Sequence, residues 1–498
     1  MGKSVLLIGF YNEAALGVRY LANTLNNKGY KPYILYFKEF NSVNPSKASE
    51  NELNLLEELI NRINPSYIGL SIMSSLYLES VYLVNNRIKN KFNIPIIWGG
   101  VYPTLFPDKC LEYADYVIMG EGEFSLVELL DSLENNNDPS YIDNVALLNG
   151  ENEIIKNPLK PLIQNLDILG YPKIGDNNTF FIHRDNIHYG DPQIKGFTYE
   201  LTASRGCPFA CSYCSSINLK RIYRGNGRFV RFRSVESVID ELTEAKSKIK
   251  KLKVIHFWDE IFSDEEGWVE EFKERYKNEI GIPFKIWGHP LKVDERTINN
   301  LVEGGLYQIV VGIQSGSYRI RKEIFNRRET QEEIINCSEV LSRCNVPRVI
   351  YDFMLQHPFE TTEDLKETFK MCLELKPPFE LQLHGLNFLP GTDIVDMALN
   401  ANLLSQEELE KIMYSPIQEQ YDMYWGPAAE SSLNEDSVLL ALIYLTQFPA
   451  LRSIVSKLAI DVENGNKERT VMVLQKLMKQ LTRARNLSEK AKLVLSRN

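Results

Sequence analysis

The chain has 498 residues, of which 44% are hydrophobic and 24% are charged, and its formal net charge is -10 at pH 7. This length provides for several domains, each with its own buried core. The acidic balance argues against a general nucleic-acid binder, because such binding depends on clustered Lys and Arg. The sequence has no amino-terminal leader pattern and no run of about 18 apolar residues, so we expect a cytoplasmic protein without a transmembrane segment.

Short apolar runs alternate with helical patterns through the first 150 residues. The predicted strands are 5–9, 32–37, 67–72, 95–100 and 116–119, and the predicted helices are 14–28, 51–63 and 78–91. This alternation indicates a parallel, doubly wound sheet, which binds ligands at the carboxyl ends of its strands. Those ends carry Gly99-Gly100 and Gly120-Glu121-Gly122. Because glycine lets a bulky ligand approach the backbone, these loops either seat a macrocycle or a nucleotide tail, or simply begin tight turns.

Residues 151–195 are rich in Asn, Asp, Pro and Gly, and no hydrophobic period persists in them. We therefore expect a connector, with a short helical segment at 162–169.

Three cysteines follow the next predicted strand, 197–202. They lie in Arg205-Gly206-Cys207-Pro208-Phe209-Ala210-Cys211-Ser212-Tyr213-Cys214, with Cys-x3-Cys-x2-Cys spacing. Such a loop can turn three thiolates toward one point, which suits an iron–sulfur cluster. The alternative is a structural zinc site, which commonly uses paired Cys-x2-Cys knuckles and a fourth ligand. The other cysteines form no second knuckle, and we expect them to be buried small hydrophobes: Cys110, Cys337, Cys344 and Cys372.

A second alternation runs to residue 388. The predicted strands are 197–202, 254–258, 284–287, 308–313, 348–355 and 381–388, and the helices between them are 235–249, 265–277, 295–303, 331–344 and 362–375. Repeated right-handed crossovers predict a full or partial barrel with its site at the carboxyl ends of the strands. Polar or turn-forming residues follow three of these strands: Asp259-Glu260, Gln314-Ser315-Gly316 and Leu389-Pro390-Gly391-Thr392.

Other polar residues in this region leave their roles open. Arg231 and Arg233 alternate along an extended piece, so they can clamp a carboxylate together or lie on a solvated surface. His357 and His384 end the last two strands as general bases, substrate contacts or structural histidines. No residue is assigned a catalytic role.

The last hundred residues are predominantly helical. The predicted helices are 394–402, 405–413, 437–448, 451–462 and 468–496. The aromatic loop 421–427 either closes the barrel over a substrate or packs against its wall. The last helix is rich in Lys and Arg, which suits a solvated face or an acidic partner or membrane surface.

The cysteine segment, with Tyr213 just before its last cysteine, resembles the signature of the radical S-adenosylmethionine (SAM) enzymes. The resemblance implies that Cys207, Cys211 and Cys214 hold a [4Fe–4S] cluster. Its open iron is expected to chelate SAM, and the reduced cluster to cleave SAM to a 5′-deoxyadenosyl radical. The residues implied to contact SAM are Tyr213, Asp259, Glu260, Gln314, Ser315 and Leu389.

The amino-terminal domain resembles the cobalamin-binding domain found in many radical SAM enzymes. The residues implied to contact cobalamin are Ser71, Gly99, Gly100, Val101, Tyr102, Pro103, Gly120, Glu121 and Gly122. Domains that bind cobalt through histidine carry Asp-x-His-x-x-Gly after the first strand. This chain has Asn12-Glu13-Ala14-Ala15-Leu16-Gly17 there, with Ala14 at the ligand position. We therefore predict a lower cobalt face that is empty or holds water or a weak side-chain donor.

These resemblances imply an α/β protein with four parts. They are a Rossmann-like cobalamin-binding domain (1–150), a linker (151–195), a partial (β/α)6 TIM-type radical SAM core (196–395) and a helical C-terminal domain (396–498). The implied activity is methyl transfer from methylcobalamin to an unactivated carbon. A cyclase or rearrangement enzyme and a non-enzymatic cobalamin-binding or sensing protein are the alternatives. Expected partners are a small-molecule, peptide or protein substrate and an electron donor such as flavodoxin or ferredoxin.

Overall fold

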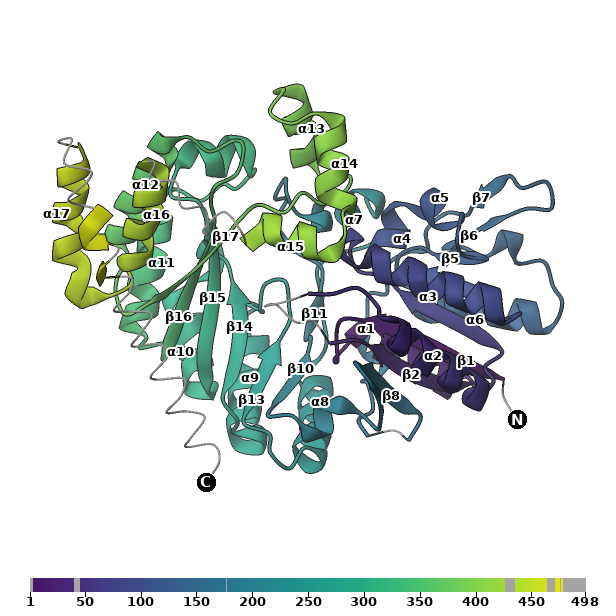
Figure 1. Cartoon of the computed structure of the whole chain (residues 1–498). Helices are drawn as coiled ribbons and strands as arrows, with labels where there is room; N and C mark the ends of the chain where they lie inside the picture. Colours follow the sequence, from purple (N-terminus) through teal and green to yellow (C-terminus); the bar gives the residue numbers. More distant parts are fainter. Residues whose placement is uncertain are drawn as a thin grey trace.

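The computed structural model describes residues 3–39, 45–175, 177–425, 435–463, 471–474 and 476–477. Two α/β halves lie side by side, and the C-terminal helices extend over both (Figure 1). The predicted fold class, with an N-terminal sheet domain, a parallel-stranded core and a helical C-terminal region, is confirmed.

The N-terminal half is built on a nine-stranded sheet in the order β7-β6-β5-β4-β3-β1-β2-β8-β9. The six central strands, β5, β4, β3, β1, β2 and β8 in sheet order, are parallel. At the two edges β6, β7 and β9 pair antiparallel. The strands are β1 (Ser4–Phe10), β2 (Lys31–Phe37), β3 (Tyr67–Ser71), β4 (Ile96–Gly99), β5 (Tyr116–Ile118), β6 (Val145–Leu148), β7 (Ile154–Lys156), β8 (Thr179–His183) and β9 (Asn186–Tyr189).

Helices cover both faces of this sheet. Those on one face are α1 (Leu16–Asn27) and α6 (Glu123–Glu134), and those on the other are α2 (Glu50–Ile63) and α3 (Leu78–Lys91). Two short helices, α4 (Val101–Leu105) and α5 (Pro107–Cys110), follow β4. Since the chain proceeds from β1 to β2 in one direction and from β3 to β5 in the other, the strand order reverses between β1 and β3.

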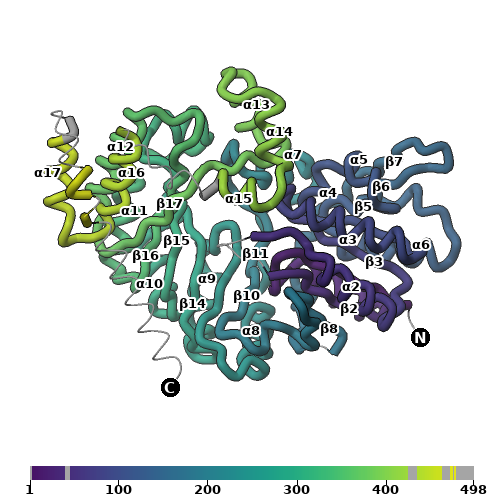
Figure 2. The backbone as a smooth tube through the Cα atoms, viewed as in Figure 1, coloured from purple at the N-terminus to yellow at the C-terminus, as the bar shows by residue number. Residues whose placement is uncertain are grey.

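The segment predicted as a linker is more structured than expected. It supplies β7, β8 and β9, together with short 3₁₀ turns at Leu166–Leu169 and Pro192–Lys195. Figure 2 traces this stretch from β7 at one edge of the N-terminal sheet to β8 at the other side and on into the second half. The sequence did not predict these three strands, because they are edge or near-edge elements of three to five residues and are too short to show a hydrophobic period.

The second half is a six-stranded, all-parallel sheet in the order β10-β13-β14-β15-β16-β17. Its strands are β10 (Thr198–Leu201), β13 (Val254–Phe257), β14 (Phe284–Gly288), β15 (Leu306–Gln314), β16 (Arg348–Met354) and β17 (Glu380–His384). The outer helices are α8 (Val235–Lys248), α9 (Trp268–Arg275), α10 (Glu295–Gly304), α11 (Gln331–Arg343) and α12 (Thr362–Glu374). The strands follow the predicted order, which confirms the partial barrel.

A two-stranded antiparallel ribbon, β11 (Ser204–Arg205) with β12 (Arg231–Phe232), stands next to the barrel. It encloses the cysteine loop and α7 (Ser215–Ile222). This ribbon was not predicted, because each of its strands is only two residues long.

The C-terminal helices divide between the two halves. After α13 (Asp393–Asn400), helices α14 (Gln406–Tyr414) and α15 (Ile417–Trp425) pack on the N-terminal half next to residues 75–77. Helices α16 (Glu435–Leu445) and α17 (Arg452–Glu463) pack on the barrel at α12. Residues 421–425 therefore end a helix instead of forming the expected loop.

The rest of that aromatic segment, and nearly all of the helix predicted at 468–496, lie outside the described residues. Within the described residues, no helix is both long and apolar enough to cross a membrane.

Candidate functional site

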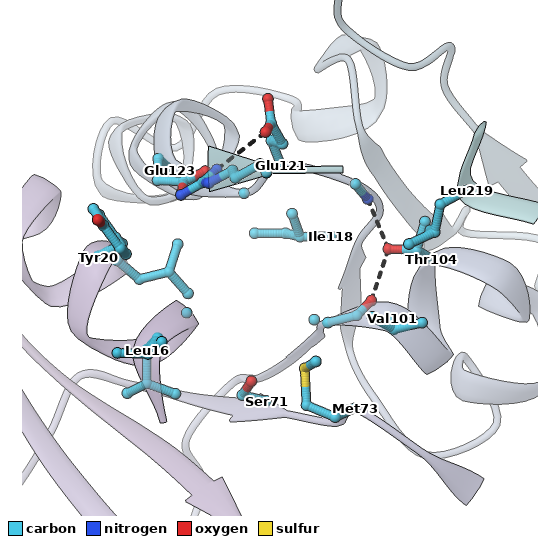
Figure 3. Close-up of a pocket in the computed structure, with 18 of the residues that line it drawn as sticks. Leu16, Tyr20, Ser71, Met73, Val101, Thr104, Ile118, Glu121, Glu123 and Leu219 are labelled. Carbon is cyan, nitrogen blue, oxygen red and sulfur yellow. Dashed lines mark hydrogen bonds and ion pairs between the residues drawn. The ribbon is translucent and has the colours of Figure 1, made fainter. Parts of the chain in front are cut away.

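A cavity of about 390 Å³ lies between the two halves, at the carboxyl edge of the N-terminal sheet. Its N-terminal wall is largely apolar and includes Leu16, Leu21, Leu70, Val101 and Ile118. Figure 3 shows several of these side chains converging on the empty space from different elements. The barrel half contributes Ser204, Arg205, Gly206, Ser216, Leu219, Tyr223, Trp258 and Glu260.

Most of the residues predicted to contact cobalamin line this cavity. They are Ser71, Gly99, Gly100, Val101, Gly120, Glu121 and Gly122. Tyr102 and Pro103 do not: α4 begins at Val101 and buries both, and the Tyr102 ring packs 5.1 Å from that of Phe106. Because α4 is helical, the side chains of Val101, Tyr102 and Pro103 point in different directions, although the three residues are consecutive in the sequence.

The backbone conformation of these loops requires glycine. Gly100 has φ 111°, and a Cβ at this position would lie 2.5 Å from the carbonyl oxygen of Ile72. Thr104 joins the two loops, because its hydroxyl donates to Gly100 O (2.7 Å) and accepts from Gly120 N (2.8 Å), as Figure 3 shows. The two loops therefore form one rigid rim of the cavity.

An interdomain ion-pair network, formed by Glu121, Glu123, Arg205 and Arg231, lies at the Gly120-Glu121-Gly122 loop of this rim. Arg205 contacts Glu121 at 3.0 Å and Glu123 at 2.5 Å, and Arg231 contacts the two Glu121 oxygens at 2.8 and 3.0 Å. The side chains of Arg231 and Glu123 are only 5% and 6% exposed. Because both arginines belong to the barrel half and both glutamates to the N-terminal half, the network fixes one half against the other.

Arg231 and Arg233 do not clamp one carboxylate together and do not lie on a solvated surface, so neither of the two roles left open for them is found. Arg231 pairs with Glu121 of the same chain, and Arg233 pairs with Glu241 of α8 at 2.5 Å, where both side chains are almost fully buried. The two arginines serve internal contacts.

A second interdomain contact lies beside the network. The hydroxyl of Tyr223 accepts a hydrogen bond from Glu121 N at 3.1 Å. A Cβ at Gly120 would lie 1.7 Å from that hydroxyl oxygen, so this tyrosine fits only against glycine. Sequence reasoning missed Tyr223, since nothing in its surroundings marks it as a partner of a loop a hundred residues away.

The three cysteines of the motif lie on the loop between β11 and α7, and each is partly exposed. The Cys214 sulfur accepts from Ser216 N at 3.5 Å and caps α7. Burial raises the pKa of Cys207 to about 11 and that of Cys214 to about 12. The other four cysteines, Cys110, Cys337, Cys344 and Cys372, are buried, as predicted.

The three thiols keep their Cys-x3-Cys-x2-Cys spacing on a single loop. Within the described residues, no group of three or more His, Cys, Asp or Glu side chains is arranged to hold a single metal ion. Arg205 and Gly206, immediately before Cys207, line the cavity, which brings the cysteine loop to its edge.

Arg327 is a further charged residue at the cysteine loop, and it was not predicted. It is 5% exposed, and its guanidinium donates to the Tyr213 hydroxyl (3.2 Å), to Gly312 O (2.6 Å) and to Glu329 (2.5 Å). It also lies 3.9 Å from the Cys211 sulfur. Arg327 is thus a buried cation beside the second cysteine of the motif.

The residues expected to contact SAM fall into two groups. Glu260 is exposed and lines the cavity. Tyr213 lies against Arg327, and the turn that begins at Leu389 contacts α7 through Asn218, which donates to Gly391 O at 2.5 Å. These three surround the cysteine loop.

Asp259 and Ser315 are used by the fold. Asp259 is 2% exposed and accepts from Ala203 N at 3.1 Å, and Ser315 is fully buried and accepts from Ser317 N at 3.1 Å. Gln314 has φ 72°, and its amide oxygen is buried with no hydrogen-bond partner within the described residues. None of the three lines the cavity.

The two strand-end histidines differ. His384 Nε2 lies 3.0 Å from both oxygens of Asp352; burial lowers the pKa of this histidine, but the Asp352 hydrogen bond more than offsets it and the pKa is raised. His357 is 4% exposed, neither ring nitrogen has a partner within the described chain, and burial lowers its pKa to about 4. Neither lines the cavity.

Family models match both halves of the chain. The B12 binding domain model matches residues 9–130, and the radical SAM superfamily model matches residues 201–372. The chain is 27% identical over 356 residues to an uncharacterised methyltransferase of Pyrococcus horikoshii, covering 70% of this chain and 72% of that one.

Two further relatives are similar at lower identity. Cytidylyl-2-hydroxyethylphosphonate methyltransferase of Streptomyces wedmorensis is 23% identical, with 63% of each chain covered. The anaerobic magnesium-protoporphyrin IX monomethyl ester cyclase of Cereibacter sphaeroides is 25% identical, with 72% of this chain and 56% of that one covered. The chain thus spans less than two thirds of these two relatives.

The fold is also found in solved structures. TsrM, a radical SAM methyltransferase from Kitasatospora setae, has a TM-score of 0.64 at 16% identity, covering 80% of this chain and 76% of that one. OxsB, a cobalamin-dependent SAM radical enzyme, has a TM-score of 0.56 at 16% identity, covering 82% and 56%.

The B12 binding domain model matches the half on one side of the cavity, and the radical SAM model matches the half on the other side. The predicted cofactors, a [4Fe–4S] cluster, SAM and cobalamin, are confirmed by these matches. The chain belongs to the cobalamin-binding radical SAM enzymes.

Proposed function

We propose that the protein is a methyltransferase that moves a methyl group from methylcobalamin to an unactivated carbon of its substrate. The observation that carries this proposal is the shared cavity: glycine loops of the cobalamin-binding half and the residues preceding Cys207 line the same space. Methyl donor and radical generator can act on one carbon only if both reach it.

The N-terminal wall fits a corrin. Apolar side chains such as Leu70, Val101 and Ile118 line it, and a Cβ at Gly17 would meet nothing within 4 Å, so the backbone there is open to a ligand. One carboxylate oxygen of Glu123 is buried with no partner within the described residues. We assign it as an acceptor for an amide N–H of the cofactor.

The lower face of the cobalt is proposed to lack a protein nitrogen. No histidine occurs among the described residues that line the cavity, and Ala14 is 4% exposed and lies outside the lining. Asn12 is occupied, because its side-chain oxygen accepts from Ala14 N (2.8 Å) and Ala15 N (3.0 Å). Ser71 and Met73 do line the cavity and are the available weak donors.

Electron paramagnetic resonance of the Co(II) form tests this axial assignment. We expect no nitrogen superhyperfine splitting, because neither a protein histidine nor the displaced benzimidazole base would bind the cobalt. Splitting by one nitrogen would contradict the assignment.

Cys207, Cys211 and Cys214 are proposed to hold the cluster, and Tyr213, Glu260 and the Leu389 turn to contact SAM beside it. When bound, the reduced cluster cleaves SAM to a radical that takes hydrogen from carbon, and methylcobalamin supplies the methyl group. Arg327 lies 3.9 Å from the Cys211 sulfur, and Glu260 offers an acceptor for the SAM ammonium at the cavity edge. The low exposure of the ion-pair network keeps bulk water from one rim.

A second candidate is a cyclisation or rearrangement that uses the same cofactors without methyl transfer. It is favoured by the relatives named as magnesium-protoporphyrin cyclases, one of which is 25% identical over 378 residues. The methyltransferase proposal has more support, because the relative at 27% identity is named a methyltransferase.

Product analysis separates the candidates. The protein is reconstituted without oxygen, reduced, and incubated with SAM, methylcobalamin and candidate substrates, and its iron, sulfide and cobalt contents are measured. Methyl transfer yields both S-adenosylhomocysteine and 5′-deoxyadenosine, whereas rearrangement yields no S-adenosylhomocysteine. Neither product would form if the protein only stored or sensed cobalamin.

The proposed partners are a substrate that enters the cavity and a low-potential electron donor such as flavodoxin or ferredoxin. We place this chemistry in the cytoplasm, because a reducing compartment keeps the three motif thiols available for iron.

A further inference from the structure

The outer surface of the cysteine loop is accessible from solvent. Pro208, between the first two motif cysteines, is exposed, and the three cysteines are themselves partly exposed. From residue 201 to residue 235, a stretch that includes the loop, α7 and the ribbon, the chain contains no Asp or Glu. The formal net charge of the whole chain is -10. The stretch around the motif is therefore basic within an acidic protein.

Two side chains from different elements hold this loop from its flanks. Lys220, on α7, donates from Nζ to Pro208 O at 2.9 Å. Asn326, between β15 and α11, donates from Nδ2 to Ala210 O at 2.7 Å. Because the two carbonyls lie only two residues apart, exposed residues next to Lys220 and Asn326 border the same surface.

Two exposed arginines are among these bordering residues. Arg224 lies four residues after Lys220, and Arg328 lies two residues after Asn326. Neither arginine side chain forms a hydrogen bond or an ion pair with any residue that the structure describes. Ile222, between Lys220 and Arg224, is 39% exposed although its side chain is large and apolar. We call Lys220, Ile222, Arg224 and Arg328 the loop patch.

The loop patch keeps an unbalanced positive charge. Its three cations have no acidic partner within the described part of the chain, and acids at neighbouring positions are matched by other cations. These pairs are Asp393 with Arg221, Glu265 with Arg228, and Glu323 with the adjacent Lys322. A positive surface on an otherwise acidic protein attracts an acidic partner to that place, because the rest of the molecule repels it.

We propose that the loop patch is the docking surface of the electron donor, and that this donor is a small acidic protein. The inference rests on the proposed function, in which the cluster must be reduced before SAM is cleaved. One electron passes from the donor to the cluster, so the donor is oxidised by one electron, the cluster is reduced by one, and no bond forms or breaks. The patch borders the loop of the three motif cysteines, and Ile222 adds an apolar contact among charged residues. A nucleic acid fits less well, because its binding depends on more cations than these three.

Rapid mixing of the reconstituted holoenzyme with reduced flavodoxin, an acidic one-electron donor, tests the assignment. Flavodoxin changes from hydroquinone to semiquinone as it reduces the cluster, and the semiquinone absorbance gives the rate. We expect the double variant Arg224→Glu, Arg328→Glu to raise the flavodoxin concentration at half-maximal rate about tenfold at low salt. The difference should shrink in about 1 M salt, where the Debye length is about 3 Å. Reduction by dithionite, which needs no docking protein, should be unchanged.

The control is the double variant Lys28→Glu, Lys277→Glu, which makes the same change in net charge at two exposed lysines outside the patch. It should leave the flavodoxin kinetics unchanged. The proposal is overturned if the two double variants behave alike, if reduction by dithionite falls as much as reduction by flavodoxin, or if flavodoxin fails to reduce a parent protein that dithionite reduces.

A nucleic-acid partner would give a different result. If the patch variant loses binding of a single-stranded DNA oligonucleotide while its flavodoxin kinetics stay unchanged, the patch serves nucleic acid and the proposal is overturned. Cluster reduction is followed without substrate, so the outcome is distinguishable from whether a methyl group is transferred.

Discussion

The two sheets of the molecule are both largely parallel, yet they present ligand sites in different ways. Consecutive residues of β1, from Val5 to Ile8, are at most 2% exposed, because helices cover both faces of that sheet. In β13 burial alternates, since helices cover only the outer face. A sheet buried on both sides can bind a ligand only at the ends of its strands, whereas the barrel sheet also offers a face.

This difference explains why the two halves place their proposed ligand-binding residues in different parts of the sheet. The residues proposed to bind cobalamin lie at the carboxyl ends of β3, β4 and β5 and in the turns that follow them, and the N-terminal sheet behind them is apolar. The barrel carries its cysteines on a loop too, but inward-facing residues of its strands, such as His256, are only partly buried. Experiments that disturb one half and spare the other test this division.

The largest expected effect is the loss of SAM cleavage in Cys207→Ala, Cys211→Ala or Cys214→Ala. Each substitution removes one thiolate ligand, so the cluster should be lost or damaged and 5′-deoxyadenosine formation should fall by about 1000-fold or more. Cobalamin should remain bound, because its predicted contacts lie in the other half. Chromatography of the nucleoside product and visible absorption of the cofactor measure the two outcomes.

Cys110→Ala serves as the matched control, since this thiol is buried in the N-terminal half and lies outside the motif. It should keep SAM cleavage. Loss of cobalamin with retained SAM cleavage in the motif variants would reverse the assignment of the two halves.

The next largest effect is expected at the interdomain ion-pair network. Glu121→Gln leaves the buried Arg231 without its full counter-charge, and breaking a buried pair in this way costs about 3–5 kcal/mol. We expect scanning calorimetry to show a lower melting temperature and a transition that separates into two. Cobalamin affinity should fall about tenfold, because Gly120 and Gly122 flank the altered residue.

Arg87→Gln is the comparison for this variant. Arg87 pairs with Glu50 and Glu57 between helices of the N-terminal half alone, and exposed pairs of this kind contribute about 0–1 kcal/mol. It should leave the single transition intact. If Glu121→Gln behaves in the same way, the network does not couple the halves.

The smallest effect concerns the pH dependence of barrel stability at Glu360. Burial raises the pKa of this carboxyl from 4.5 to about 8. The folded state therefore holds the proton more tightly than the unfolded state, and stability falls as pH rises from about 4.5 to 8. Glu360→Gln mimics the protonated form and still accepts from Gln356 N.

We expect Glu360→Gln to melt higher than the parent protein at pH 9, by about 5 °C, and nearly equally at pH 5. Thermal melts at both pH values measure the difference. Glu363→Gln, at a carboxylate that is 67% exposed, should show no such dependence. Equal pH profiles for parent and Glu360→Gln would remove the titration of Glu360 as the cause.

Much of the fold could be predicted from hydrophobic periodicity. The succession of strands and helices along both halves was accessible, and so were capped helices, because elements such as Thr330 with Glu333 form complete capping boxes that the sequence displays. The edge strands β7 to β9 and the ribbon β11–β12 were not, since strands of two to five residues leave no measurable period.

The candidate site was predictable where local motifs mark it and missed where distant residues meet. Glycine turns and the cysteine spacing placed most of the cavity rim. Tyr223, Arg327 and the partner of Arg231 were missed, because each contact joins residues about a hundred or more positions apart. The sequence pattern also included Asp259 as a SAM contact together with its neighbour Glu260, but the Asp259 side chain is buried and accepts a hydrogen bond from Ala203 N.

The fit of Tyr223 against Gly120 has a consequence for how such enzymes can be recombined. A chimera that joins this cobalamin-binding half to the barrel of a relative must carry both residues, since a Cβ at Gly120 would lie 1.7 Å from the tyrosine oxygen. The two positions belong to different domains, so a substitution at one of them alone would disrupt the contact between the halves. Domain shuffling is thereby restricted to pairs that already share this contact.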